Sequence, residues 1–233
     1  MRNEAKGYLL KEYGSWSVLT IAYLIGLGVS GRFSWQAVPV FLALGLLINS
    51  KQTFTKLIRR AADRASLAIF FGQLFIATVI LLAVFNRDIP RLLPLLVFPA
   101  AYLVMSAIAG EHFVLTELLG FVLLSLAAVL AKFLLTGGLD IRLFAGVALY
   151  FAAGVFKIKA VLLKKTVDRI LTVVAVVFAA FAYHGMHLRL IILLPLLDNL
   201  IVAAALYRAK LQTTGWIEVV KSLLFLGLFI YYF

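Results

Sequence analysis

The chain has 233 residues, of which 64% are hydrophobic and 14% are charged, and its formal net charge is +12. Soluble domains carry about 25% charged residues, so this composition excludes an ordinary soluble protein and indicates an integral membrane protein. The chain has no cysteine, which excludes disulfides and thiolate ligands, and membrane topology explains the scattered basic residues more simply than nucleic-acid binding does.

Nine apolar runs follow one another along the chain, and each is predicted to form a transmembrane helix. The polar residues 1–14 before the first run lack the pattern of a cleaved signal peptide, so we expect the amino terminus to be retained. The runs are continuous rather than alternating, which favours helices over a membrane barrel. They are Trp16–Val29, Trp35–Ile48, Ala65–Phe85, Leu92–Ile108, Leu115–Leu135, Leu143–Lys157, Ile170–Tyr183, Leu190–Tyr207 and Ile217–Phe233.

The basic residues predict an orientation for these spans. If all nine runs cross the membrane, sixteen of the 22 Lys and Arg residues lie on the side of the amino terminus and six lie on the other side. Cytoplasmic loops carry an excess of Lys and Arg. We therefore expect the amino terminus in the cytoplasm and the carboxyl terminus outside.

Two loops of the chain share a sequence pattern that predicts an internal repeat. Leu57–Arg64 and Leu162–Arg169 both read as two aliphatic residues, two bases, two spacers, Asp and Arg. The two Asp residues are 105 positions apart, and Glu12 and Glu117 have the same separation. Membrane folds are often built from duplicated helix sets. The sequence therefore predicts one transmembrane domain over residues 1–233, with four-helix repeats at about 9–110 and 114–215 and a final helix at 216–233.

The predicted topology places ten polar and charged residues where they could bind a ligand at the cytoplasmic face. Arg and Lys bind anionic head groups such as phosphate, and an acid inside an apolar helix is costly and often functional. Basic loops that only fix the topology, with weak surface ion pairs, are the competing interpretation. The candidates are Glu12, Asn49, Arg59, Arg60, Asp63, Glu117, Lys164, Lys165, Asp168 and Glu218.

Other polar residues permit more than one interpretation. Asp198 and Asn199 lie deepest in a predicted span and could mark an ion or substrate path, or form an inter-helix hydrogen bond. His184 and His187 have a metal-like spacing but lack a third ligand, so no metal site is predicted. Lys132 is close enough to a span end to snorkel to the interface.

Four short motifs stand out at span ends, namely Glu12–Trp16, Glu117–Gly120, Val155–Lys159 and Gly215–Glu218. Together they resemble the YwiC-like family of bacterial membrane proteins. The chain departs from the family pattern at Tyr13, where the family usually has His between Glu and Gly. The resemblance implies a multi-pass protein of the bacterial cytoplasmic (inner) membrane.

The nine-helix plan also resembles the UbiA-type prenyltransferases, which place an Asp-rich motif in the loops after helices two and six. In this chain Asn49 matches the first position of the first motif, but Thr53 and Leu57 stand where its carboxylates should recur. The second loop offers Asp168 alone. The resemblance implies a prenyltransferase-like enzyme only if this site works without the usual motifs, and Mg²⁺ only if a prenyl diphosphate is bound.

Three functions remain open from the sequence. The first, slightly preferred, is a UbiA-like protein that binds, and could transform, an isoprenoid or quinone-like amphiphile with its anionic head at the cytoplasmic face. The second is a non-catalytic accessory or assembly subunit of a membrane respiratory complex. The third is a small proton-coupled transporter that uses Asp198.

Overall fold

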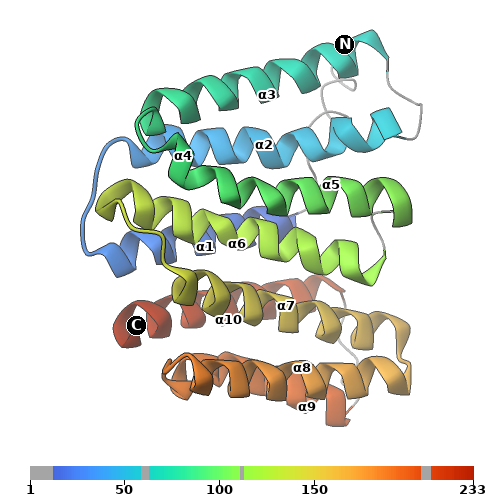
Figure 1. The fold of residues 1–233 in the computed structure, drawn as a ribbon. Helices are drawn as coiled ribbons and strands as arrows, with labels where there is room; N and C mark the ends of the chain where they lie inside the picture. The colour runs from blue at the N-terminus through green and yellow to red at the C-terminus, as the bar shows by residue number, and fades with distance from the viewer. Residues whose placement is uncertain (1–12, 59–62, 111–112, 206–210) are drawn as a thin grey trace.

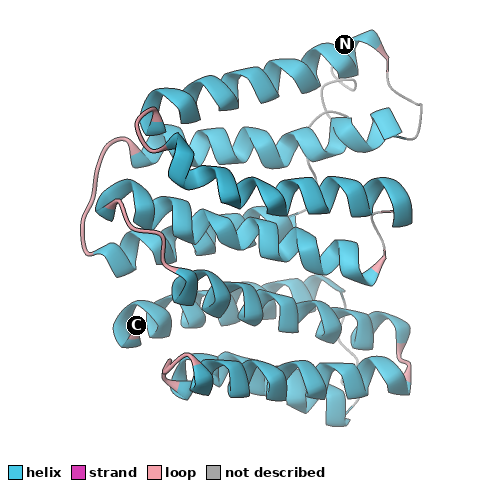
Figure 2. Ribbon diagram, viewed as in Figure 1, coloured by secondary structure: helices cyan, strands magenta, loops and turns pink. Residues whose placement is uncertain are grey.

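The computed structural model describes residues 13–58, 63–110, 113–205 and 211–233, and all regular structure within these ranges is helical (Figures 1 and 2). Within the described ranges, seven helices are long and apolar enough to cross a membrane, and two shorter apolar helices, Gly14–Ser30 and Leu190–Ala205, lie at the other two predicted positions. The prediction of an all-helical, multi-pass membrane protein is confirmed. Lipid therefore surrounds much of the bundle.

Some helices are longer than the apolar runs from which they were predicted. The sixth run was predicted to end at Lys157, but its helix continues to Leu163, and the last helix begins at Leu211 rather than Ile217. The elements are α1 (Tyr13–Ser30), α2 (Ala37–Ile58), α3 (Arg64–Phe85), α4 (Ile89–Leu92), η2 (Leu93–Leu96), α5 (Val97–Ala109), α6 (Val114–Thr136), α7 (Ile141–Leu163), α8 (Thr166–Gly185), η3 (Leu190–Leu196), α9 (Leu197–Ala205) and α10 (Leu211–Tyr232).

Two of the predicted spans are interrupted by a short 3₁₀ segment. The fourth span consists of α4, η2 and α5, and the eighth consists of η3 and α9. Pro94 lies within η2 and Pro195 within η3. Proline lacks the backbone N–H that a helix interior needs and clashes with the preceding turn, so a change of helix type at these positions is expected.

The helices lie roughly side by side in an elongated bundle, with α3 at one end and α8 and α9 at the other (Figure 1). In the middle, α1 packs along α6 and α10, and α7 packs against both α6 and α8. The core lies here and includes the fully buried Ile25, Ala128, Val147 and Phe225. At the α3 end, α2 packs against α3. The internal repeat stays a prediction.

Lys132 on α6 and Asp140 in the following loop form an ion pair at the end of the bundle where α6 meets α7, and we call this pair the polar latch. Gly137, with a positive φ of 68°, ends α6, and Asp140 caps α7 by accepting hydrogen bonds from the backbone N–H groups of Arg142 and Leu143 at 3.0 and 3.1 Å. The second carboxylate oxygen of Asp140 accepts a hydrogen bond from Lys132 Nζ at 2.6 Å. The Lys132 ammonium thus reaches out of α6 to a partner in the loop.

The latch predicts a pH-dependent contribution to stability. Burial raises the pKa of the Asp140 carboxyl, but the Lys132 ammonium and the two backbone N–H groups lower it, and the net pKa lies below its ordinary value. The resulting stabilisation is fully present above the pKa of an unfolded Asp, about 3.9, and is lost as the pH falls through the lower folded pKa.

Asp140→Asn keeps a capping oxygen while removing the charge. We expect it to lower the free energy of unfolding at pH 7 by about 1–2 kcal/mol, with the difference from the unmodified protein shrinking below pH 4. Unfolding in mixed micelles at several pH values measures both. A difference that stays constant from pH 7 to pH 3 would show that the charge of Asp140 is not what stabilises the latch.

Candidate functional site

Four charged side chains from three helices meet inside the second half of the bundle. Lys157 on α7 forms ion pairs with Asp198 on α9 and Glu218 on α10. On α10, Lys221 Nζ lies 3.2 Å from Asp198 Oδ2 and 3.2 Å from Glu218 Oε1. We call Lys157, Asp198, Glu218 and Lys221 the ionic network. Its two ammonium groups and two carboxylates balance in charge.

Asn199 joins the ionic network to the backbone of α7. Its side chain is fully buried, and its Oδ1 accepts a hydrogen bond from Lys221 Nζ at 2.6 Å. Its Nδ2 donates to the carbonyl oxygen of Ala153 at 3.3 Å. Both ends of the amide are therefore satisfied, as a buried polar group requires, and the amide fixes the position of the Lys221 ammonium.

Aromatic side chains separate the ionic network from the far end of the bundle. The ring of Tyr150 on α7 stacks on that of Phe225 on α10, with centroids 3.6 Å apart and planes 3° apart. Phe229 follows Phe225 one turn along α10, with its ring centroid 5.3 Å away. Lys157 and Lys221 lie on the other side of this layer along their helices. The ionic network is thus confined to one half of the bundle.

The local sequence explains why the acids lie inside a membrane span. Pro195 is in η3, and Asp198 follows in the first turn of α9, where the helix dipole stabilises a negative charge. Glu218 and Lys221 are three residues apart on α10, a spacing that places both on one face. Lys157 lies six residues before the end of α7, which is about 9 Å along the axis.

The acids and the lysines differ in exposure. The side chains of Lys157 and Lys221 are 2% and 8% exposed, whereas those of Asp198 and Glu218 are 32% and 26% exposed. Buried charges are costly unless they are paired, and here each lysine is enclosed by carboxylates. The accessible side of the ionic network is therefore negative.

A second ion pair lies on another side of α7. Lys159 Nζ is 2.8 Å from Glu117 Oε2, which joins α7 to the first turn of α6. Lys157 and Lys159 are two residues apart, which turns them by about 200° around the helix axis. On α7, Lys157 therefore points toward α9 and α10, and Lys159 points toward α6. Of the candidates named from the sequence, Glu117 and Glu218 have these lysine partners.

The remaining described candidates are spread over the bundle. Asp63 is exposed and caps α3, accepting a hydrogen bond from the Ser66 backbone N–H at 2.8 Å. Asn49 is buried within α2. Asp168 lies in the first turn of α8, and one of its carboxylate oxygens has no hydrogen-bond partner among the described residues. Lys164 and Lys165 are exposed between α7 and α8. Glu12, Arg59 and Arg60 lie outside the described residues.

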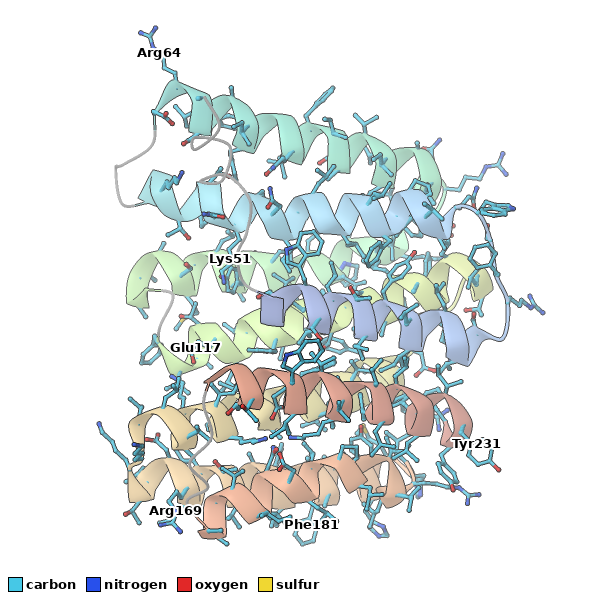
Figure 3. The ribbon with its side chains drawn as sticks, turned by 180° about the vertical axis from the view of Figure 1, so that it is seen from behind. Lys51, Arg64, Glu117, Arg169, Phe181 and Tyr231 are labelled. Atoms are coloured by element: carbon cyan, nitrogen blue, oxygen red, sulfur yellow. The ribbon has the colours of Figure 1, made fainter. Side chains whose placement is uncertain are left out.

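The two loops with the shared sequence pattern lie far apart. Figure 3 labels Arg64, which follows Asp63, and Arg169, which follows Asp168, and these residues are at opposite ends of the bundle. The packed helices α1, α6, α7 and α10 lie between them. The structure therefore does not bring Asp63 and Asp168 to one pocket. Instead, Arg169 donates hydrogen bonds to the carbonyl oxygens of Ala203 and Ala204 near the end of α9, at 2.5 and 2.9 Å.

Sequence reasoning missed both lysines of the ionic network. Lys157 and Lys221 were counted only among the sixteen bases on the side of the amino terminus, not among the candidate ligand-binding residues, and both are buried within helices, α7 and α10. An available signal was the number of polar residues in the last spans: Asp198, Glu218 and Lys221 lie in two consecutive helices and have opposite charges. In a sequence, a charged residue marks the end of an apolar run. In the folded protein, a partner on another helix can neutralise that charge inside the membrane.

Comparison with known proteins gives a family and no solved relative. The family described as YwiC-like protein matches residues 9–132. No curated protein and no solved structure matches the chain. The matched region includes Asn49, Asp63 and Glu117, and it ends before the helices that carry the ionic network.

Proposed function

The chain belongs to the YwiC-like family, and we propose that it is a small proton-coupled transporter in which the ionic network binds the proton. The observation that carries this proposal is the pair of accessible carboxylates, Asp198 and Glu218, held by two buried lysines inside membrane helices. Ionisable groups at such depth are expensive and commonly mark ion pathways.

The broken eighth span supports a transport function. In many transporters the substrate and ion sites lie beside discontinuous helices, near half-helix ends. Asp198 is the second residue of α9, immediately after the 3₁₀ segment that contains Pro195. An interrupted helix has fewer backbone bonds along its axis than a continuous one, so α9 can move relative to η3 at a smaller energetic cost. Such a movement would expose Asp198 alternately to the two sides.

Protonation provides the coupling between charge and packing. When a carboxylate oxygen of Asp198 binds a proton, the attraction between Asp198 and the two ammonium groups is lost, and the ionic network changes from neutral to a charge of +1. Glu218 remains as the partner of Lys157 and Lys221. A proton can therefore change the position of α9 without leaving either lysine unpaired.

Asp198→Asn is expected to abolish proton uptake into vesicles. Purified protein is reconstituted into liposomes that contain a pH-sensitive dye, and uptake is driven by a potassium diffusion potential. The assay is run with and without an external mixture of amino acids, organic acids and amines. Asp88→Asn is the matched control, because Asp88 is an acid in the short turn between α3 and α4 that pairs with Arg91 at 3.4 Å, and it should retain uptake.

The outcomes separate the alternatives. Uptake by the unmodified protein that exceeds that of protein-free liposomes, and that falls to their level with Asp198→Asn, supports transport. Uptake that never exceeds the protein-free level in either condition overturns the proposal. Uptake that Asp198→Asn leaves unchanged removes Asp198 as the coupling acid.

A second candidate is the binding of an isoprenoid or quinone-like amphiphile, as in a UbiA-like bundle. Lys164 and Lys165 support it, because both ammonium groups are exposed between α7 and α8 and form no ion pair within the described chain. An anionic head could bind there. Of the described acids, Asp168 lies just beyond this pair in the first turn of α8, whereas Asp63 caps α3. Their neighbours Arg169 and Arg64 are at opposite ends of the bundle (Figure 3), which is a poor arrangement for Mg²⁺. Lipids that copurify with the protein, identified by mass spectrometry, distinguish this candidate from transport.

An accessory role in a membrane complex is favoured by the sparsely packed end of the bundle. In the spans Arg64–Phe85 and Ile89–Ala109, 6% of the most apolar stretch is buried within the chain. These helices leave long apolar faces for lipid or for another membrane protein. Stoichiometric partners after purification from native membranes would favour the accessory role over independent transport.

A further inference from the structure

An apolar groove of about 330 Å³ lies between α7 and α8. Its α7 residues lie nearer the Ile141 end of that helix than Lys157 of the ionic network does. Four alanines form much of its surface: Ala145, Ala148 and Ala152 from α7 and Ala182 from α8. Larger side chains line the rest, namely Val122, Phe144, Leu149, Phe178 and Met186. The lining is entirely apolar, and its volume falls in the range of small-molecule sites.

The small residues create the groove. Along α7, residues 145, 148, 149 and 152 recur at the spacing of one helix face, and three of them are alanine. Phe178 and Ala182 on α8 repeat at four-residue spacing. Because both helices are membrane-spanning, the groove opens toward hydrocarbon rather than water. An apolar occupant from the surrounding membrane, such as an acyl chain, suits this lining.

A free cation lies beyond one end of the groove. Arg142 is one turn before Ala145, in the first turn of α7, and its exposed side chain has no ion pair with the described residues. Three neighbouring bases at the same end are engaged elsewhere: Lys132 with Asp140 at 2.6 Å, Arg91 with Asp88 at 3.4 Å, and Arg189 over the Tyr232 ring at 5.6 Å. Arg142 is thus available for an anion at the membrane surface.

We propose that this groove binds one acyl chain of an anionic phospholipid whose phosphate is held by Arg142. The groove supplies an apolar surface parallel to the membrane normal, and a guanidinium at the interface binds phosphate oxygens in a bidentate manner. Charge complementarity favours an anionic over a zwitterionic head group. The site is separate from the ionic network and does not depend on transport.

The test compares retained lipids in purified protein. Protein is reconstituted in nanodiscs with equal amounts of phosphatidylglycerol and phosphatidylethanolamine of the same acyl chains, transferred to detergent and analysed by native mass spectrometry. We expect one retained lipid, with phosphatidylglycerol favoured by about fivefold. Arg142→Gln should abolish this preference while leaving the packing intact, and Ala145→Phe, which fills the groove, should abolish retention of both lipids.

The control variant is Ala100→Phe, which makes the same change on an exposed face of α5 outside the groove. It should retain phosphatidylglycerol as the unmodified protein does. Size-exclusion chromatography establishes that each variant is folded, and Arg142→Gln keeps the proposal testable if Ala145→Phe does not fold. Equal retention of the two lipids by the unmodified protein, or unchanged retention in both groove variants, would mean annular lipid only and would overturn the proposal.

Discussion

Lys157→Met is expected to lower the free energy of unfolding by about 3–5 kcal/mol, the usual effect of removing one partner from a buried ion pair. Met has a similar length and suits an apolar site, so the change removes charge with little loss of volume. It leaves Asp198 and Glu218 with one ammonium, that of Lys221. The ionic network then has a net charge of −1 inside a membrane span.

A second change should restore the balance. Lys157→Met combined with Glu218→Gln returns the ionic network to a neutral Asp198–Lys221 pair, which lies at 3.2 Å. We expect the double variant to recover more than half of the lost stability. Charge imbalance would be the wrong explanation if the double variant were no more stable than Lys157→Met alone.

Lys159→Met is the matched control for this experiment. Lys159 lies two residues further along α7 and pairs with Glu117 at 2.8 Å, but its side chain is more exposed, at 15%. Ion pairs that remain partly solvated contribute little, so we expect a loss of about 1 kcal/mol or less. Unfolding in mixed micelles, followed by circular dichroism, measures all three variants on one scale.

Gly26→Ala is expected to destabilise the protein by about 1–3 kcal/mol, as overpacking of a tight core does. Gly26 is on α1 where it packs along α6, and an added Cβ would lie 2.1 Å from the carbonyl oxygen of Ala128 and 2.8 Å from the Cβ of Ala131. Both neighbours are fully buried. Since a backbone oxygen cannot swing aside as a long side chain can, the two helices must separate.

Gly72→Ala provides the control for this substitution. Gly72 is within α3, and no atom of the described part of the chain lies within 4 Å of an added Cβ. Alanine there should leave stability unchanged or raise it by up to about 1 kcal/mol through helix propensity. Thermal unfolding of the two variants in the same detergent separates packing from propensity. If Gly26→Ala were as stable as Gly72→Ala, the close approach of α1 and α6 would not be needed for the fold.

The helices could be predicted because each one depends on the apolar composition of its own segment. A run such as Ala65–Phe85 is apolar throughout, and a membrane leaves a spanning segment no alternative to internal backbone hydrogen bonds. The observed helix, Arg64–Phe85, therefore agrees closely with the prediction. The sixth apolar run ends at Lys157 although its helix continues to Leu163, because hydropathy counts a lysine as an interruption whether or not another helix neutralises it.

The sequence by itself determined that this is an all-helical membrane protein, and it identified Glu218 and Asp198 as residues of interest. Only the tertiary structure decided that Lys157 and Lys221 complete a neutral ionic network with them, and that Asp63 and Asp168 lie far apart. The physical reason is that helix formation in a membrane is decided by local composition. The pairing of charges depends on which helices pack together, and in this chain the partners are 41 and 61 residues apart along the sequence.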